Sequence, residues 1–285
     1  FELISCNKKE IFKILTSSGT TSQIPSKIFL DRFNIKNQSK ALSKIFSSFT
    51  GLNRPNLLIV DTPSILSDRK QYSARTAGVI GFRSLCKKAE FALNNNFELD
   101  FIKINNFLDK CENQPFLIFG FTSIIFNYLL KEELPQNYKN KFKNSVLLHG
   151  GGWKKLQKLS ISHKDFNNLV FNKIGVEKVC NYYGMVEQTG SIFMECEKGF
   201  LHSNPLATVL ARSQNDLSII SKTNKKGIAQ VLSVLPTSYP GHSLLTDDIV
   251  EIKHFNNCPC GRNGIAFLIH GRISKSEIRG CSDTR

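Results

Sequence analysis

The sequence has no hydrophobic segment long enough to cross a membrane. Its longest apolar stretch, Phe116 to Leu130, is interrupted by Gly120 and by polar residues, and it falls short of the roughly 20 apolar residues that a membrane-spanning helix needs. No N-terminal pattern typical of a signal peptide is present either, although the chain begins at Phe1 and not at a methionine. We therefore expect a chain with no membrane span that acts in the cytoplasm.

Common signatures of nucleic-acid and phosphate binding are also missing. There is no G-x-x-x-x-G-K-[ST] phosphate loop, no aromatic and basic pattern of an RNA-binding sheet, and no helix-turn-helix pattern. The formal net charge of +15 would suit nucleic acid, but the lysines are scattered along the 285 residues. We expect no nucleic-acid partner. An anionic nucleotide or a carboxylate substrate would benefit from the same positive field.

The eight cysteines are expected to be free thiols and not disulfides in a cytoplasmic chain of this size. Five stand in apolar surroundings and are expected to be small core residues: Cys6, Cys86, Cys111, Cys180 and Cys196. Cys258 and Cys260 form a C-x-C pair, but a zinc site normally needs four ligands and no second close cysteine pair follows. Whether this pair binds a metal is left open. Cys281 lies in the polar tail I-R-G-C-S-D-T-R.

The hydrophobic pattern changes near Gly190, and this change predicts the fold class. Before it, short apolar runs alternate with helical patterns, which indicates an α/β fold with a mostly parallel sheet covered by helices. Strands are expected at 57–60, 116–119, 146–148 and 179–183, and helices after a cap at Asp31, at 124–130 and at 165–174. After it, a β-rich part is expected, with strands at 191–196, 207–211, 217–221, 228–235, 248–252 and 265–270. We predict one domain over residues 1–285, with an α/β part to about 190, a β-rich part over 191–278 and a tail over 279–285.

One polar loop is the centre of the functional interpretation. Thr16 to Lys27 reads T-S-S-G-T-T-S-Q-I-P-S-K and lies between two short strand-like runs, 11–15 and 27–30. Its hydroxyls, its backbone N–H groups and the Lys27 cation match the oxygens of a phosphate chain, because consecutive N–H groups in a turn form an anion-binding concavity. Taken alone, a surface hairpin rich in serine and threonine is the somewhat better interpretation.

Further stretches carry groups suited to a bound nucleotide. They are N-Y-Y-G-M-V-E-Q-T-G at 181–190, L-L-T-D-D-I-V-E at 244–251, H-G-R-I-S at 270–274 and a triple glycine after the strand expected to end at Leu148. The carboxyl ends of parallel strands are where such sheets bind ligands. Taken singly, each stretch has an ordinary explanation: a core tyrosine, a solvated acid, a turn or a surface arginine. Their order and spacing favour a shared function.

That order resembles the adenylate-forming superfamily, which includes acyl-CoA synthetases, luciferases and peptide-synthetase adenylation domains. Members carry a Ser/Thr/Gly-rich phosphate loop, a glycine pair, and Y-G-x-T-E, T-G-D and G-R signatures. The matching segments here are 16–27, 150–152, 183–187, 246–248 and 271–272. Two positions depart from the pattern, since Val186 replaces a threonine and Asp247 replaces a glycine. The chain also ends soon after Arg272, so we expect the small mobile C-terminal domain of most members to be absent.

Within the superfamily, the sequence is similar to the acyl-protein synthetase (LuxE-type) family, whose members look like S-S-G-T-T-S-Q, Y-G-M-x-E-Q-T-G and R-G-C-S. These motifs match 17–23, 183–190 and 279–282 here. The resemblance implies a ligase that uses ATP and Mg²⁺ to activate a carboxylic acid, expected to be a fatty acid, as acyl-AMP with release of pyrophosphate. The acyl group then passes to a cysteine thiol as a thioester. The expected partner is an acyl-CoA reductase or an acyl-carrier or transferase protein.

The resemblance also implies roles for individual residues. Phosphate oxygens would be bound by Ser17, Ser18, Gly19, Thr20, Thr21 and Lys27. Adenosine would be bound by Gly150, Gly151, Gly152, Tyr183, Gly184, Met185 and Asp248, with Arg272 close to the ribose and phosphate. Glu187 would hold Mg²⁺, and Cys281 would carry the acyl group. An apolar acyl pocket would be lined in part by Phe119, Phe121, Ile124 and Trp153.

Two other functions stay open at this stage. The first is an AMP-forming acid–CoA ligase of the phenylacetate–CoA ligase type, in which coenzyme A and not a protein thiol accepts the acyl group. The second is a non-catalytic protein that binds a nucleotide or nucleic acid, which the positive charge suggests. Pyrophosphate exchange with a panel of acids separates catalysis from binding.

Overall fold

The computed structural model describes residues 3–16, 26–67, 74–152 and 161–273. These residues form two compact units. The first unit consists of residues 3–49 and 182–273, and the second unit consists of residues 50–181. Each unit combines strands and helices, and the predicted α/β class is confirmed. Within the described ranges, no helix is both long enough and apolar enough to cross a membrane.

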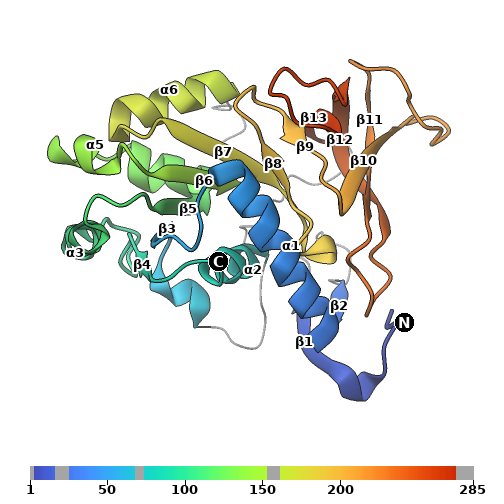
Figure 1. The fold of residues 1–285 in the computed structure, drawn as a ribbon, viewed down its shortest axis with the longest axis horizontal. Coiled ribbons are helices and arrows are strands. Elements are labelled where there is room, and N and C mark those ends of the chain that lie inside the picture. The colour runs from blue at the N-terminus through green and yellow to red at the C-terminus, as the bar shows by residue number, and fades with distance from the viewer. Residues whose placement is uncertain (1–2, 17–25, 68–73, 153–160, 274–285) are drawn as a thin grey trace. The chain divides into compact units, whose positions relative to one another are not determined.

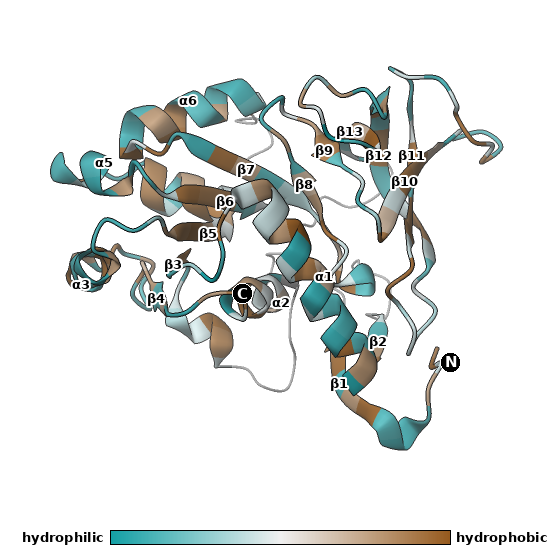
Figure 2. Ribbon diagram, in the orientation of Figure 1, coloured by the Kyte–Doolittle hydropathy of each residue, from teal (hydrophilic) through white to brown (hydrophobic). Residues whose placement is uncertain are grey.

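The second unit is built on a parallel sheet. Its strands are β4 (Ala89–Phe91), β3 (Leu57–Val60), β5 (Leu117–Phe121) and β6 (Val146–Gly150), which are neighbours in that order. Every residue of β3, β5 and β6 is buried, and Figure 2 shows β5 and β6 in the hydrophobic colour. Strands are apolar throughout when helices cover both faces of a sheet. The three strands predicted ahead of Gly151 are confirmed to within two residues at each end.

The connections of the second unit contain α2 (Ala74–Arg83), α3 (Phe101–Cys111), α4 (Thr122–Ile125), α5 (Asn137–Phe142) and α6 (His163–Ile174). α5 and α6 lie beside each other along one side of the strands (Figure 1). Asp100 and Ser162 start α3 and α6, because their side chains accept hydrogen bonds from backbone N–H groups of the first turn. The helix predicted at 165–174 is confirmed as α6. The helix predicted at 124–130 is found as α4 followed by a π-helical segment, η3 (Phe126–Leu130).

The first unit begins with a hairpin that leads directly into a long helix. β1 (Ile11–Thr16) and β2 (Lys27–Asp31) pair in antiparallel fashion, as the two strand-like runs predict. α1 (Arg32–Thr50) follows at once. The backbone N–H of Asn34 donates to Asp31 Oδ1 at 2.6 Å, which satisfies a group that has no partner inside the helix. The predicted cap at Asp31 is therefore confirmed.

The rest of the first unit is an antiparallel sheet. Its strands are β8 (Phe193–Glu195), β9 (Leu201–His202), β10 (Ala207–Arg212), β11 (Lys226–Ser233), β12 (Ser243–Phe255), β13 (Ile265–Arg272) and the end of β7 (Lys178–Tyr183). They are neighbours in the order β10-β11-β12-β13-β9-β8-β7. Side chains of β10 and β11 are buried at every second position, which indicates that one face of the sheet lies on a core. Val209, Val231, Val250 and Phe267 belong to that core.

The strand predicted at 217–221 is wrong. Residues 217–221 form no regular strand and contribute a single bridge, between Ile219 and Arg212. Leu217 has a φ angle of 58°, which lies in the left-handed region and outside any strand conformation. Its backbone N–H donates back to Ser213 O at 3.0 Å. A short apolar run does not by itself distinguish a strand from a turn with exposed apolar side chains.

The cysteines expected in the core are buried with one exception. Cys86, Cys111, Cys180 and Cys196 are buried free thiols, whereas Cys6 is half-buried, so the expectation for Cys6 is wrong. Cys6 lies in the segment ahead of β1, and both of its sequence neighbours are exposed. The nearby apolar residues of the sequence therefore do not enclose it.

Candidate nucleotide-binding site

The segment 184–190, which follows β7, is attached to the sheet of the first unit through one buried amide. Gln188 Nε2 donates to Val231 O at 3.2 Å and to Gly241 O at 2.7 Å. These bonds join the segment to β11 and to the turn that follows it. The backbone of Glu187, the adjacent residue, is thereby fixed relative to the sheet.

Close packing fixes the same segment on both sides of Glu187. Gly190 has a φ angle of +86°, and a Cβ atom there would lie 2.7 Å from Gln38 Cα in α1. Only a glycine fits that approach without a shift of the helix. Gly184 has Ile192 as its nearest neighbour, at 3.0 Å from the position of a Cβ atom. Met185 packs against the apolar core of the sheet.

Glu187 is the acidic group of this segment. Burial raises the pKa of its carboxyl group, while a hydrogen bond from its own backbone and the Arg272 guanidinium act in the opposite direction. The buried phenol of Tyr239 is close by, and burial together with the Glu187 carboxylate raises the Tyr239 pKa. A partly buried carboxylate of this kind gains from a cation. Mg²⁺ is commonly held by one or two carboxylates together with substrate phosphates, so Glu187 fits the predicted metal role.

Three side chains from distant parts of the chain meet beside β12. Tyr183 Oη donates to Asp248 Oδ2 at 2.7 Å, and Arg272 Nε lies 3.6 Å from Asp248 Oδ1. The register of β12 and β13 places Asp248 opposite Arg272, and Tyr183 ends β7. The side chains of Arg272 and Asp248 are 33% and 19% exposed. We call these three residues the Tyr183–Asp248–Arg272 cluster; it is ordered by its own contacts and still open to a ligand.

The two neighbouring aspartates of the T-D-D motif lie in strand β12, not in a turn, and differ in their surroundings. The Asp248 backbone N–H donates to Thr246 Oγ1 at 3.1 Å, and that hydroxyl donates to Ala229 O at 2.9 Å. Asp247 is exposed, and its carbonyl accepts a hydrogen bond from the Ile273 backbone at 2.9 Å. Asp248 is therefore the aspartate of this motif that joins the cluster.

The hydroxyl-rich loop is described only at its two ends. Thr16 and Lys27 are partners in the register of β1 and β2, and Lys27 is exposed. The predicted phosphate-binding residues between them lie outside the described residues: Ser17, Ser18, Gly19, Thr20 and Thr21. Their role stays a prediction.

The triple glycine lies at the end of β6 in the second unit. Gly151 has a φ angle of +76°, and a Cβ atom there would lie 3.0 Å from the ring of Phe121. Gly152 has open space around it. Thr122 Oγ1 lies 3.1 Å from Gly150 O and 2.9 Å from Gly151 O, so one hydroxyl fixes the turn. The part that the glycines take in adenine binding stays a prediction.

Thr122 also contacts His149, which belongs to none of the sequence motifs. His149 Nδ1 lies 2.9 Å from Thr122 Oγ1. Burial lowers the pKa of His149 to about 3, so its ring is neutral at physiological pH. His149 precedes the glycines directly, but a single histidine and a single threonine belong to no motif. Tyr239, beside Glu187, was missed for the same reason.

The residues proposed for the acyl pocket are buried in the second unit where they are described. Phe119 lies on β5 and packs against Phe82 of α2, with ring centroids 4.6 Å apart. Phe121 ends the same strand, and Ile124 follows in α4. Trp153 lies outside the described residues. Apolar character is thus present at these positions, and their contact with a substrate stays a prediction.

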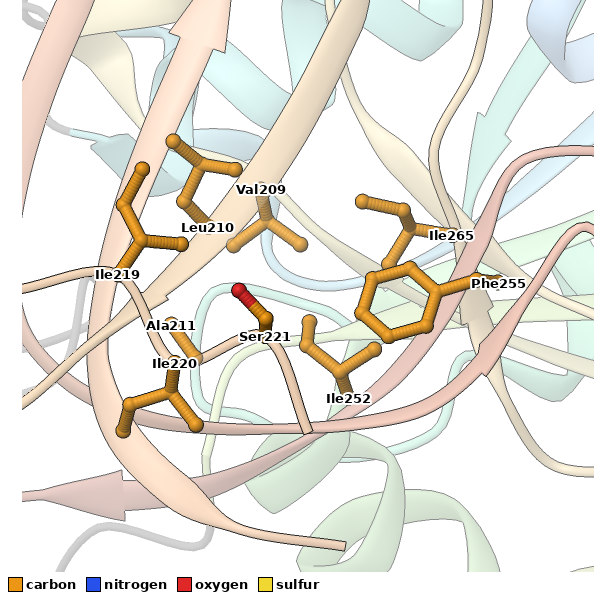
Figure 3. Close-up of a pocket in the computed structure, with 9 residues that line it drawn as sticks. All are labelled: Val209, Leu210, Ala211, Ile219, Ile220, Ser221, Ile252, Phe255 and Ile265. Carbon is orange, nitrogen blue, oxygen red and sulfur yellow. The ribbon is translucent and has the colours of Figure 1, made fainter. Parts of the chain in front are cut away.

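The first unit also contains an apolar cavity of about 300 Å³ between β10, β12, β13 and the segment 219–221 (Figure 3). Aliphatic side chains and the ring of Phe255 surround it. Ser221 supplies the one oxygen among the side chains drawn. None of the predicted site residues lines this cavity, and its lining carries no group suited to acid–base or metal chemistry.

Comparison with known proteins places this geometry in context. The family described as acyl-protein synthetase, LuxE, matches residues 1–285. The long-chain-fatty-acid–luciferin-component ligase of Aliivibrio fischeri is 26% identical over 209 residues, which make up 72% of this chain and 54% of that protein.

Solved structures of two ligases are similar in fold. An open conformation of 2-hydroxyisobutyryl-CoA ligase, in complex with 2-HIB-AMP and CoA, matches with a TM-score of 0.68 at 18% identity, over 95% of this chain and 59% of that one. ATP-bound MatB from Rhodopseudomonas palustris matches with a TM-score of 0.61 at 15% identity, over 94% and 49%. The chain thus spans between about half and three-fifths of the length of these relatives.

The fold is that of adenylate-forming ligases, as the structural likeness establishes. Three of the sequence motifs place Tyr183 at the end of β7, Asp248 on β12 and Arg272 on β13, and the family match extends over the whole sequence. The chain belongs to the acyl-protein synthetase (LuxE) family.

Proposed function

We propose that this chain is an ATP-dependent acyl-protein synthetase. It activates a carboxylic acid as acyl-AMP, releases pyrophosphate, and passes the acyl group to a cysteine thiol. The observation that carries the proposal is the Tyr183–Asp248–Arg272 cluster, in which an aromatic ring, a carboxylate and a guanidinium meet at 2.7 and 3.6 Å. These are the groups that would face an adenine, a ribose and a phosphate.

Nucleotide binding follows from the hydrogen-bonding capacity of the cluster. Asp248 accepts one hydrogen bond from Tyr183 at Oδ2, and Arg272 lies near Oδ1. An ionised carboxylate accepts about four hydrogen bonds, so both oxygens keep capacity for the two ribose hydroxyls. The bond from its hydroxyl holds the Tyr183 side chain beside Asp248, and its ring would stack on adenine.

Adenylation is the first chemical step. One carboxylate oxygen of the acid attacks the α-phosphorus of ATP, the bond from that phosphorus to the bridging oxygen breaks, and pyrophosphate leaves. Arg272 and Lys27 stabilise negative charge on the phosphate oxygens. Mg²⁺, when bound, neutralises charge on the phosphates. Glu187, whose backbone is fixed through the adjacent Gln188, would hold this ion.

Thioester formation is the second step. A cysteine thiolate attacks the acyl carbonyl, the carbon–oxygen bond to phosphate breaks, and AMP leaves. We assign the thiol to Cys281 on the strength of the R-G-C-S match alone, since Cys281 lies outside the described residues. Arg279 and Arg285 stand near it in sequence, and nearby cations favour the thiolate form.

The substrate and the partner are inferred from the relatives. The name of the Aliivibrio fischeri protein specifies a long-chain fatty acid and a luciferin component, which supports a fatty acid as the substrate here. The acyl group would pass on to a reductase or to an acyl-carrier or transferase protein in the cytoplasm. The two solved ligases include a CoA ligase with bound CoA, which makes coenzyme A the second candidate acceptor.

The test is pyrophosphate exchange into ATP with a panel of carboxylic acids of increasing chain length. We expect exchange that depends on the acid and is strongest with a fatty acid. ATP binding without exchange for any acid would contradict catalysis and favour a non-catalytic nucleotide-binding protein. Adding coenzyme A then distinguishes the acceptors, because a CoA ligase releases free acyl-CoA, whereas an acyl-protein synthetase retains the acyl group on protein.

A further inference from the structure

Four metal-ligating side chains meet at the end of the first unit's sheet that lies away from the Tyr183–Asp248–Arg272 cluster. One ligand atom from each of Cys196, His202, Cys258 and Cys260 lies within 4.8 Å of the others. Three of these residues are buried and Cys260 is partly buried. His202 Nε2 and Cys260 Sγ are 3.4 Å apart. We call these residues the Cys3His cluster.

Strand pairing explains why residues so far apart in sequence meet. Cys196 follows β8 and His202 ends β9, so both belong to one hairpin. Cys258 and Cys260 lie in the loop between β12 and β13. β9 pairs with β13, with His202 opposite Ala266, and this pairing brings the two turns together. The sequence contains no second close cysteine pair that would indicate this arrangement, because the two ligands besides Cys258 and Cys260 are a lone cysteine and a lone histidine.

Backbone N–H groups are placed to stabilise the sulfurs as thiolates. Cys260 Sγ accepts a hydrogen bond from the Arg262 backbone at 3.4 Å. The Lys198 backbone likewise donates to Cys196, and the Cys260 backbone donates to Cys258. In all three hydrogen bonds the donor lies two residues after the cysteine that accepts. Thiolates, and not thiols, are the form that binds a metal.

Burial acts against charged thiolates that have no cation beside them. Cys196, His202 and Cys258 are buried and Cys260 is partly buried, so little water reaches the four ligand atoms. Three sulfurs with backbone N–H donors and one imidazole, all within 4.8 Å of one another, are therefore complementary to a divalent cation.

The spacing of the ligand atoms favours a single metal ion over an iron–sulfur cluster or a disulfide. In a tetrahedral site with metal–sulfur distances of about 2.3 Å, neighbouring ligands are about 3.8 Å apart, and the Cys3His cluster needs little adjustment to reach this. An iron–sulfur cluster places several iron and sulfide atoms between its cysteines and needs wider spacing. A disulfide would use two of the sulfurs and leave the third sulfur and the imidazole without a purpose.

We propose that Cys196, His202, Cys258 and Cys260 bind one zinc ion in a structural site. Four protein ligands fill a tetrahedral zinc completely, so the site is closed and leaves no position for a substrate. The ion would link the β8–β9 turn to the β12–β13 loop. β12 and β13 also carry Asp248 and Arg272, so the ion would stabilise the hairpin that presents the nucleotide-binding groups.

The direct test measures the metal content of the purified chain by mass spectrometry, after removal of any affinity tag and without chelators. We expect about one zinc per chain. Cys196→Ser and Cys258→Ser should lower the content to near zero. Cys86→Ser changes another buried thiol elsewhere and should leave the content unchanged. Wild-type protein without stoichiometric zinc, or zinc that persists in both cluster variants, would overturn the proposal.

Cobalt gives a second measurement that does not depend on the variants folding. Protein produced in minimal medium with Co²⁺ should show the intense visible absorption of tetrahedral cobalt and the sulfur-to-cobalt charge-transfer bands of a thiolate site. A weak spectrum typical of six oxygen or nitrogen ligands contradicts the proposal. So does a disulfide between any two of the three cluster cysteines in freshly purified protein.

Discussion

The β12–β13 hairpin carries two groups of polar side chains that differ in their exposure. At one end, Asp248 and Arg272 are partners in the register and both are partly open to solvent. At the other end, Phe255 pairs with Ile265, and the loop beyond this pair directs its cysteine sulfurs toward Cys196 and His202.

The difference indicates what each group can do. At the nucleotide end, charged groups retain hydrogen-bonding capacity that a ligand can use, so this end suits binding and release. In the Cys3His cluster, the ligand atoms face one another, so it suits a permanently held ion. One hairpin can therefore serve a reaction at one end and stability at the other, and changes at the two ends should have separable effects.

The largest difference in effect is expected between a substitution of Cys281 and substitutions of the cysteines of the Cys3His cluster. Cys281→Ser should abolish the thioester, because the acyl carrier is lost, while adenylation and zinc content stay at the wild-type level. Labelled fatty acid, ATP and Mg²⁺ are added, and the protein-bound label is released with neutral hydroxylamine. If a hydroxylamine-sensitive label persists in Cys281→Ser, another residue carries the acyl group.

Glu187→Gln should lower adenylation by about 10²–10³-fold, which is the usual effect of losing one group that stabilises charge in a transition state. Pyrophosphate exchange measures the effect, and zinc content serves as the control that the opposite end of the hairpin is intact. Exchange at the wild-type rate in this folded variant would remove Glu187 from the reaction.

Asp248→Ala should weaken ATP binding by about tenfold to a hundredfold, because the two ribose hydroxyls lose an acceptor and Tyr183 and Arg272 lose their shared partner. Asp247→Ala is the matched control and should change little, since that side chain is exposed. Calorimetric titration with ATP measures both variants. If Asp247→Ala weakened ATP binding and Asp248→Ala did not, Asp247 and not Asp248 would be the residue that binds the ribose.

The smallest effect concerns stability. Burial raises the pKa of Glu187 in the folded chain, so its ionised form is disfavoured there and costs stability above that pKa. Glu187→Gln should therefore raise the free energy of unfolding at neutral pH. This gain should shrink as the pH falls from the raised pKa of Glu187 toward the ordinary pKa of a glutamate, because the wild-type carboxyl group becomes protonated in that range. Denaturant unfolding at several pH values measures the gain. Exposed Glu132→Gln is the control, and an equal gain there would refute burial as the cause.

Local patterns account for what the sequence predicted correctly. The strands around β3, β5 and β6 were predictable because each is a continuous apolar run. Tyr183, Asp248 and Arg272 were found because each lies in a short motif and the motifs follow one another in a recognisable order. The structure adds that three of these motifs converge on Asp248.

What the sequence did not predict depends on contacts between distant residues or on a single backbone angle. The Cys3His cluster is formed by the pairing of β9 with β13, which no local pattern encodes. Thr122 and His149 meet only because β5 and β6 are adjacent in the sheet. The error at 217–221 came from the left-handed conformation of Leu217, a residue type that rarely adopts it.

The central claim is that the acid's carboxylate attacks the α-phosphorus of ATP. An acid carrying a heavy-oxygen label in its carboxylate tests it directly, in a reaction that runs through to thioester and is analysed by mass spectrometry. Attack at the α-phosphorus leaves one labelled oxygen in the AMP that is released, and this is the result we predict. AMP without label, or label in inorganic phosphate with ADP as the product, would contradict adenylation.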